Sequence, residues 1–188
     1  MSLNVASAWI LTASGRRFSL DDPRPEDVHP DDLAHALSHL CRFGGHTRVH
    51  YSVAQHSVLV ASLLPPRLAL AGLLHDAAEA YVGDCVGPLA HRLPEFRSVE
   101  LRILEVIGER FGVPFADFRS GEVRNADAVA LLTERASFLP PSRQPWAEDL
   151  RGVQPLPGTL EALPSHVARV RFLERLRRLA GRTALQEV

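Results

Sequence analysis

The stretch RLALAGLLHDAAEAY, at residues 67–81, constrains the fold more than any other part of the sequence. Leucine and alanine, the strongest helix formers, dominate this stretch. Gly83 follows it and is placed to end a helix. We therefore expect a continuous helix over 67–81, and its apolar composition places this helix in the interior of the protein.

Other segments carry apolar residues at three- and four-residue spacing, which is the pattern of helices that bury one face. These segments are residues 31–40, 53–64, 99–111, 123–138 and 166–179. Residues 9–20 instead place apolar stretches on either side of Ser14-Gly15, which predicts a small β-hairpin. The expected fold is therefore all-α, with a small N-terminal β-hairpin as an appendage on the helices.

The size and composition of the chain suit a single domain over residues 1–188, since 46% of the residues are apolar and 23% are charged. Residues 139–164 form a proline-rich loop without periodicity, long enough to act as a lid or as a subunit contact in a homo-oligomer. Within this loop, Trp146 could stack on a ligand, contact a neighbouring subunit or anchor the loop to its own core. A C-terminal helix over about 165–180 follows.

The charge balance argues against large anionic partners. A net charge of −1 and a pI of about 6.8 give no overall field that would attract a nucleic-acid polymer or an anionic membrane. No apolar run approaches the roughly 20 residues of a membrane span, and the N-terminus lacks the features of a signal peptide. Cys41 and Cys85 form no CxxC pair, which suits reduced thiols. We therefore expect a cytoplasmic protein.

The chemistry of the chain centres on His75 and Asp76. Two ionisable residues in such an apolar helix cost several kcal/mol unless they are paired or bind a metal ion. Glu79 follows at helical spacing, so a regular helix would place its carboxylate on the same face. An isolated His-Asp pair is more often explained by a histidine that bonds a backbone carbonyl, so the pair alone does not identify a site.

Two further segments repeat this pattern of a titratable side chain in an apolar helix. His56 lies in SVAQHSVLVA and Asp127 lies in NADAVALL. Two imidazoles and two carboxylates on three helices supply the mixed nitrogen and oxygen ligands that suit Zn²⁺, Mn²⁺, Co²⁺ or Fe²⁺. His35 and His39 could form a second, surface metal site, although ordinary exposed histidines are favoured there.

The order H…HD…D, with VAQHS, LLHDAAEAYVGD and NADAV, resembles the HD-domain phosphohydrolases over about residues 34–136. The string CRFGGH…YSVAQHS…HDAAEAYVGDCVGPL is similar to the small 5′-deoxynucleotidases and, more closely, to bacterial and phage proteins that include dATP triphosphohydrolases. This resemblance implies a single HD-domain helical bundle that hydrolyses deoxynucleoside triphosphates with a divalent ion (Mn, Co, Zn, Fe or Mg). The alternatives are a 5′-deoxynucleotidase acting on dNMPs and a non-catalytic nucleotide-sensing protein.

The resemblance also implies roles for individual residues around the ion. Glu79 matches the carboxylate that orients or deprotonates the attacking water, and Asp84 matches a second acidic residue that positions the water or donates to the leaving oxygen. The residues that match the family's metal ligands are His56, His75, Asp76 and Asp127.

The substrate contacts follow from the same resemblance. Arg42 matches an arginine that meets substrate phosphate, a role that suits its forked donors. Phe43 stands where the nucleotidases have tryptophan, and we expect it to shape the nucleoside pocket. Pro88 is expected to contribute to the base pocket, with a plain loop role as the alternative.

Overall fold

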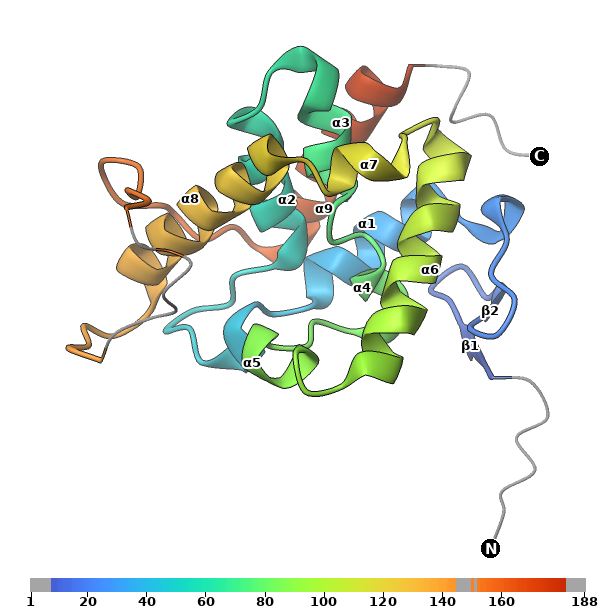
Figure 1. Ribbon diagram of the computed structural model, residues 1–188, viewed down its shortest axis with the longest axis horizontal. Coiled ribbons are helices and arrows are strands. Elements are labelled where there is room, and N and C mark those ends of the chain that lie inside the picture. The colour runs from blue at the N-terminus through green and yellow to red at the C-terminus, as the bar shows by residue number, and fades with distance from the viewer. Residues whose placement is uncertain (1–7, 145–149, 151, 182–188) are drawn as a thin grey trace, which may run out of the picture.

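The computed structural model describes residues 8–144, 150 and 152–181. Helices make up most of this part of the chain, and a two-stranded antiparallel hairpin lies near its N-terminus (Figure 1). This arrangement confirms the predicted all-α fold with an N-terminal hairpin. Within the described ranges, no helix combines the length and the apolar character needed to cross a lipid bilayer.

The helices fall into long and short groups. The long ones are α1 (Pro30–His39), α2 (Val53–Ser62), α3 (Pro66–Leu74), α6 (Pro94–Phe111), α8 (Gly121–Phe138) and α9 (Ser165–Ala180). Between them lie the four-residue helices α4 (Glu79–Val82), α5 (Gly87–Ala90) and α7 (Phe115–Phe118), and the 3-10 turns η1 (Pro25–Asp27) and η2 (Phe43–Gly45). The sequence did not predict α5 or α7, because four residues are too few to establish a helical period.

Helix α2 is the central helix of the fold. It packs against α1, α3, α8 and α9. Its first turn is capped by Ser52, whose side-chain oxygen accepts a hydrogen bond from the Gln55 N–H at 3.2 Å. Because its neighbours enclose it, α2 holds the His56 side chain with no solvent-exposed surface.

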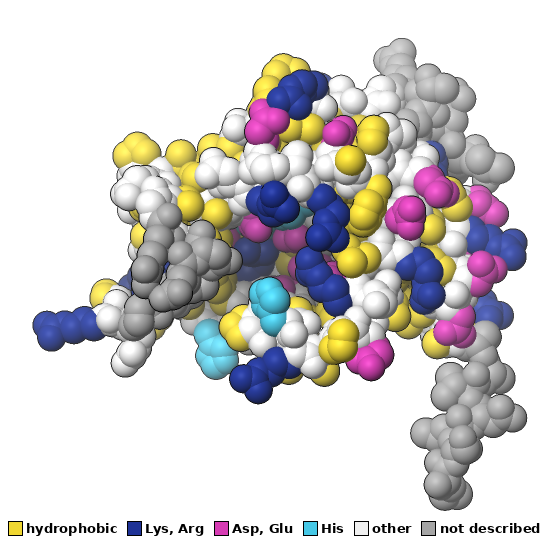
Figure 2. Space-filling view, in the orientation of Figure 1, with side chains coloured by type: hydrophobic (Ala, Val, Ile, Leu, Met, Phe, Trp, Pro, Cys, Tyr) yellow, Lys and Arg dark blue, Asp and Glu magenta, His cyan; other side chains and the backbone are white. Residues whose placement is uncertain are grey.

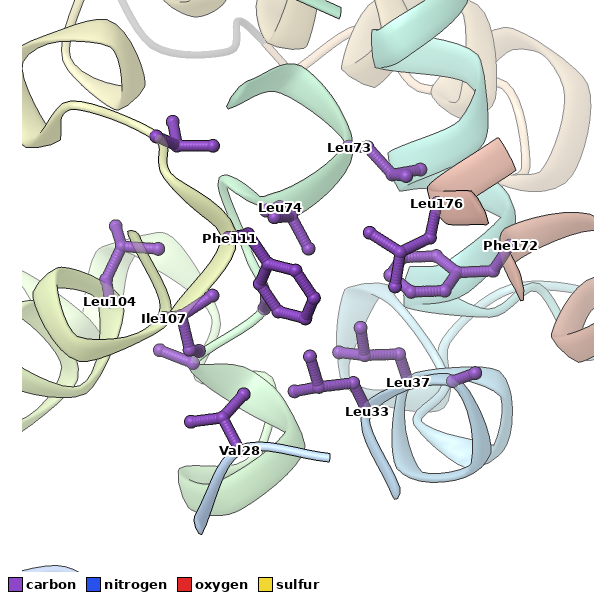
Figure 3. Packing of buried hydrophobic residues seen from close by; sticks show 14 of the residues in the cluster. Val28, Leu33, Leu37, Leu73, Leu74, Leu104, Ile107, Phe111, Phe172 and Leu176 are labelled. Atoms are coloured by element: carbon purple, nitrogen blue, oxygen red, sulfur yellow. The ribbon is translucent and has the colours of Figure 1, made fainter. Parts of the chain in front are cut away.

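The hydrophobic core lies between α1, α3, α6 and α9. Full burial of one large apolar side chain stabilises a fold by roughly 1.5–3 kcal/mol. This core therefore fixes α3 firmly, and His75 follows directly at the end of α3. Figure 3 shows the principal side chains, which are Leu33, Leu37, Leu73, Leu74, Ile107, Phe111, Phe172 and Leu176.

The N-terminal hairpin pairs β1 (Trp9–Leu11) with β2 (Arg17–Ser19). Gly15 supplies a positive φ of 79° in the turn, as the predicted Ser14-Gly15 pair requires. The Phe18 ring is fully buried and stacks on Tyr81 of α4, with ring centroids 3.6 Å apart. The hairpin is therefore part of the core, and the prediction of a mere appendage understated its role.

The predicted continuous helix over 67–81 is wrong at one point, because α3 ends at Leu74 and α4 begins at Glu79. In the turn between them, the Ala77 N–H donates to the Leu74 carbonyl at 2.9 Å, and the Glu79 N–H donates to the Asp76 carbonyl at 3.0 Å. This three-residue spacing is tighter than that of an α-helix. Helix propensity is only a weak constraint, and here the α-helical pattern gives way to a turn that begins at the His75-Asp76 pair.

The proline-rich loop over 139–164 contains no α-helix or strand among its described residues. Its second half is tied to α8, where the Thr133 hydroxyl accepts a hydrogen bond from the Leu156 N–H at 2.9 Å. Trp146, predicted to contact a ligand, a neighbouring subunit or its own core, lies outside the described residues.

Gly108 of α6 sits at a point of close backbone approach. A Cβ at this position would lie 2.7 Å from the Val113 carbonyl oxygen and 3.0 Å from the Phe118 ring. Because the nearer atom belongs to the backbone, we expect Gly108→Ala to destabilise the fold by about 1–3 kcal/mol, as overpacking does. Thermal unfolding followed by circular dichroism measures the change.

The matched control is Gly121→Ala in α8, because a Cβ at Gly121 would meet no atom within 4 Å. This second substitution should leave the melting temperature unchanged or raise it slightly. Equal melting temperatures for the two variants would contradict the close approach at Gly108.

Candidate metal centre

His56, His75 and Asp76 form a compact group of potential ligands whose donor atoms all lie within 4.8 Å of one another. The Nε2 atom of His56 is 3.3 Å from Nε2 of His75 and 3.3 Å from Oδ2 of Asp76. Helix α2 supplies His56, and the bend after α3 supplies the other two residues. Across the described part of the chain, no other such group of three histidine, cysteine or acidic residues occurs.

Helix α8 brings Asp127 against both histidines. Its Oδ1 atom is 3.3 Å from Nε2 of His56 and 3.9 Å from Nε2 of His75. The Asp127 side chain is 41% exposed, whereas that of His56 has no exposed surface. The four predicted ligands are thus brought together, and Asp127 lies on the side of the group that faces solvent.

Hydrogen bonds fix the orientation of both imidazoles. Nδ1 of His75 is 2.9 Å from the Gly72 carbonyl oxygen, and Nδ1 of His56 is 2.7 Å from Oε1 of Glu134. A carbonyl or carboxylate oxygen only accepts, so Nδ1 carries the proton in each ring. The Nε2 atoms therefore face the shared space, where each can coordinate a metal ion once its proton is displaced.

Charge in this group is balanced between imidazoles and carboxylates. Burial alone would lower the pKa of His75, but Asp76 and Asp127 outweigh it and raise this pKa to about 10. Burial likewise opposes the charged form of His56, yet Glu134 and the same two aspartates raise its pKa. The metal-free histidines therefore hold protons at neutral pH. A divalent cation would carry the same positive charge as the two histidine protons that it displaces. This set of donors therefore fits a divalent cation.

Glu79 adds a second feature that fits a metal centre. Its side chain is only 8% exposed, and its Oε2 atom is buried with no hydrogen-bonding partner among the described residues. Burial, followed by the charges of Asp76 and Asp84, raises the pKa of Glu79. A buried oxygen without a partner costs roughly 1–3 kcal/mol. A bound ion or a water molecule would supply the missing partner.

Arg42 lies beside the ligand group because the loop that follows it returns to the start of α2. Its backbone N–H donates to the Tyr51 carbonyl at 2.9 Å. Its guanidinium donates from Nε to Oε2 of Glu134 at 3.1 Å and from Nη1 to Oδ2 of Asp76 at 3.4 Å. The predicted phosphate-binding arginine is therefore nearly buried and in contact with one of the predicted metal ligands.

Phe43 adopts an unusual backbone conformation next to Arg42. Its φ of 57° lies in the left-handed region, which costs a side-chain-bearing residue roughly 1–2 kcal/mol. The Arg42 guanidinium carbon is 5.6 Å from the centre of the Phe43 ring, within cation–π range. A Cβ on Gly44 would be 3.5 Å from Val86, so this loop lies against the segment before α5.

Asp84 and Pro88 lie on the chain that leaves α4. Asp84 is partly buried, and its pKa is raised by burial and by Asp76, although Arg42 opposes this shift. Asp84 is therefore close enough to the ligand group for the charge of Asp76 to affect its pKa. Pro88 is exposed in the first turn of α5, and its predicted role in a base pocket stays a prediction.

Sequence reasoning missed Glu134, which has no exposed surface and three bonding partners. Besides His56 and Arg42, it accepts a hydrogen bond from the Tyr51 hydroxyl at 2.9 Å. A signal for it exists in the sequence, because Glu134 follows Asp127 by seven residues, or about two helical turns. Both side chains therefore lie on the same face of α8.

Arginine side chains gather at the opening of the site. Figure 2 shows a recess in the region of α5, α6 and α8, with acidic side chains at its floor and dark blue side chains around it. The sequence contains no lysine, so every dark blue side chain is arginine. Helix α6 carries Arg97, bonded to Glu100 at 3.3 Å. Burial raises the pKa of Glu100, and Asp76 adds to this shift, which indicates that this turn of α6 lies near the site.

The fold and the site define a mostly helical protein with a buried His–His–Asp group that can hold a metal ion. No protein-family model matches the chain. It is 42% identical over 128 residues to the uncharacterized protein YfdR of Escherichia coli strain K12, an alignment that covers 68% of this chain and 71% of YfdR. The chain therefore belongs to the same family as YfdR. It is also 38% identical over 117 residues to the uncharacterized protein RCAP_rcc00048 of Rhodobacter capsulatus, covering 57% of this chain and 60% of that protein.

The first prediction from this geometry is that each chain binds one divalent ion and that His75→Ala or Asp76→Ala abolishes binding. Loss of either ligand breaks the group and leaves its buried neighbours uncompensated. Elemental analysis of the purified variants measures the metal content. His166→Ala, at an exposed position in the first turn of α9, is the matched control and should retain the ion. Full metal content in both ligand variants would refute the site.

A second prediction concerns pH. Because the metal-free pKa of His75 is raised to about 10, an ion that binds at pH 7 must displace a proton from its Nε2. Proton release makes the affinity increase with pH through the neutral range and level off only as the pH nears 10. Calorimetric titration at pH 7, in two buffers of different ionisation enthalpy, measures the released protons. A heat of binding that is identical in both buffers would contradict this linkage.

Proposed function

We propose that this chain is a metal-dependent phosphohydrolase of the HD-domain kind that acts on deoxynucleotides, most specifically on deoxynucleoside triphosphates such as dATP. The observation that carries the proposal is the His56–His75–Asp76 group, joined by Asp127 and accompanied by Glu79, whose buried Oε2 atom has no hydrogen-bonding partner among the described residues. The resemblance of the motifs that contain these residues to that superfamily supports the same reaction class.

Four side chains would hold the ion. When bound, a divalent cation supplies Lewis acidity, which makes an attacking water more acidic and withdraws charge from a phosphoryl oxygen. Two neutral imidazoles and two carboxylates suit Mn²⁺, Co²⁺, Zn²⁺ or Fe²⁺, and Mg²⁺ is the remaining candidate. The proposed ligands are His56 Nε2, His75 Nε2, and the carboxylates of Asp76 and Asp127.

Glu79 is the proposed general base. Its buried carboxylate has a raised pKa, so it accepts a proton at neutral pH more readily than an exposed glutamate does. As the water oxygen forms its bond to phosphorus, Glu79 takes the water proton, and the bond from phosphorus to the leaving oxygen breaks. Asp84, whose pKa is also raised, is the candidate to position the water or to protonate the leaving oxygen.

Arg42 is the proposed phosphate-binding residue. A guanidinium has five N–H donors, and in the described part of the chain the bonds to Glu134 and Asp76 engage two of them; the remaining donors are the ones proposed to bind phosphate beside the ligand group. The arginine side chains around the recess in Figure 2 favour an anionic substrate in the same place. Phe43, held next to Arg42, is the proposed contact for the nucleoside.

A substrate screen tests this proposal. The purified protein is incubated with each candidate metal ion and with dNTPs, dNMPs or cyclic dinucleotides, and the products are separated by chromatography. Hydrolysis of dNTPs is the expected result. Phosphate release from dNMPs alone would indicate a 5′-deoxynucleotidase, and nucleotide binding without turnover would indicate a sensor.

Glu79→Gln tests the role of the base. The variant should keep its metal ion and its fold, while turnover falls by about 100-fold or more, the loss expected for removal of a general base. The control is Glu105→Gln, the same change at an exposed position of α6. A fully active Glu79→Gln variant would transfer the role of base to Asp84.

A further inference from the structure

Glu134 joins the metal-binding and phosphate-binding sides of the site through one buried carboxylate. We propose that Glu134 is a positioning residue that holds His56 in its metal-binding tautomer and, at the same time, holds the guanidinium of Arg42 next to the ligand group. The inference rests on the proposed function in that it takes His56 as a ligand and Arg42 as a phosphate contact. It adds that one side chain sets the geometry of both.

The burial of Glu134 needs an explanation beyond stability. A charged carboxylate with no exposed surface has a large desolvation cost, and replacing such buried ionic groups with apolar ones is often neutral or stabilising. Here the buried position keeps a carboxylate, and both of its oxygens accept hydrogen bonds. Oε1 accepts from the Tyr51 hydroxyl at 2.9 Å and from His56 Nδ1 at 2.7 Å, and Oε2 accepts from Arg42 Nε at 3.1 Å.

The contact with His56 selects one of the two neutral tautomers of the ring. With the proton held on Nδ1 by Glu134, the Nε2 lone pair is left free toward His75 and Asp76. The opposite tautomer would direct an N–H into the ligand group. Carboxylates that bond the far nitrogen of a metal-ligating histidine orient the ring in this way and increase its basicity.

The contact with Arg42 fixes the plane of the guanidinium. With Nε held by Oε2 of Glu134, the orientation of the guanidinium plane is set, and Nη1 on its other edge reaches Asp76 at 3.4 Å. Because the two oxygens of one carboxylate hold His56 and Arg42, a shift of Glu134 moves both. Metal affinity and phosphate affinity should therefore change together when Glu134 is altered.

Glu134→Gln separates charge from shape, since glutamine has the same size but only one accepting oxygen. If the amide oxygen faces His56 and Tyr51, the amide N–H₂ points at the Arg42 Nε–H, and two donors oppose each other. If the amide is turned round, its N–H₂ faces His56 Nδ1 and favours the tautomer that blocks metal binding. Either orientation disturbs one side of the site.

The test compares Glu134→Gln with Glu122→Gln, the same change at an exposed position of the same helix. Calorimetric titration with Mn²⁺ or Zn²⁺ measures metal affinity without any turnover, and circular dichroism checks the fold. We expect Glu134→Gln to weaken metal binding by about 10- to 100-fold and to raise KM for the nucleotide more than it lowers kcat at saturating metal. Glu122→Gln should match the wild type.

The outcomes separate this inference from the proposed function. If the wild type binds metal and a folded Glu134→Gln variant binds it equally well, the inference fails and the proposed function stands. If the wild type binds no ion, both fail.

A measurement on the wild type covers the case in which the variant does not fold. Nitrogen-15 NMR of the Zn²⁺-loaded protein should show His56 protonated at Nδ1. A proton on Nε2 would overturn the inference.

Discussion

The charge balance around His56 is the constraint on which the rest of the structure depends. Around the fully buried His56 and Glu134, the carboxylates of Asp76, Asp127 and Glu134 face two imidazoles and the guanidinium of Arg42. Each of these groups would be costly to bury alone, and each is tolerable only because the others are present. The helices must therefore dock in one arrangement, since any slip would leave a buried charge without its partner.

The packing of the helices holds these charged groups in position. Helix α2 packs against α1, α3, α8 and α9, and the His56 side chain on its second turn has no exposed surface. The core in Figure 3 holds the end of α3 in place, and Phe18 of the hairpin holds α4 through Tyr81. Functional groups carried on such rigid elements keep their geometry better than groups on loops do.

The sequence allowed most of the fold to be predicted, because helical periodicity depends on which residues are buried and not on which helix they meet. The interruption of the helix after Leu74 was not predictable, since it opposes the high helix propensity of this Leu- and Ala-rich stretch. The site could be predicted only in part. His56 and Asp127 stood out as titratable residues in apolar helices, whereas Glu134, in LLTERASF, reads as an ordinary charge on a solvated face.

The bond between Arg42 and Glu134 could not be predicted from the sequence either. Its partner Glu134 lies 92 residues further along the chain, and nothing local distinguishes this pair from any other arginine and glutamate. Once α8 is docked, Asp127 and Glu134 arrive together on one helix face, one among the proposed ligands and the other beneath them. Docking of α8 therefore supplies both a proposed metal ligand, Asp127, and the carboxylate that orients His56, Glu134.

The separation of His56 and Glu134 by 78 residues also sets the order of events during synthesis. A nascent chain that has emerged only as far as α6 already contains His56, His75 and Asp76, but it lacks the α8 carboxylates that complete their surroundings. Contacts over such distances form late, because closing a long loop has an entropic cost before any contact compensates for it. The four side chains of the candidate site and the Glu134 carboxylate thus come together only when α8 docks, after the helices that carry His56, His75 and Asp76 have been made.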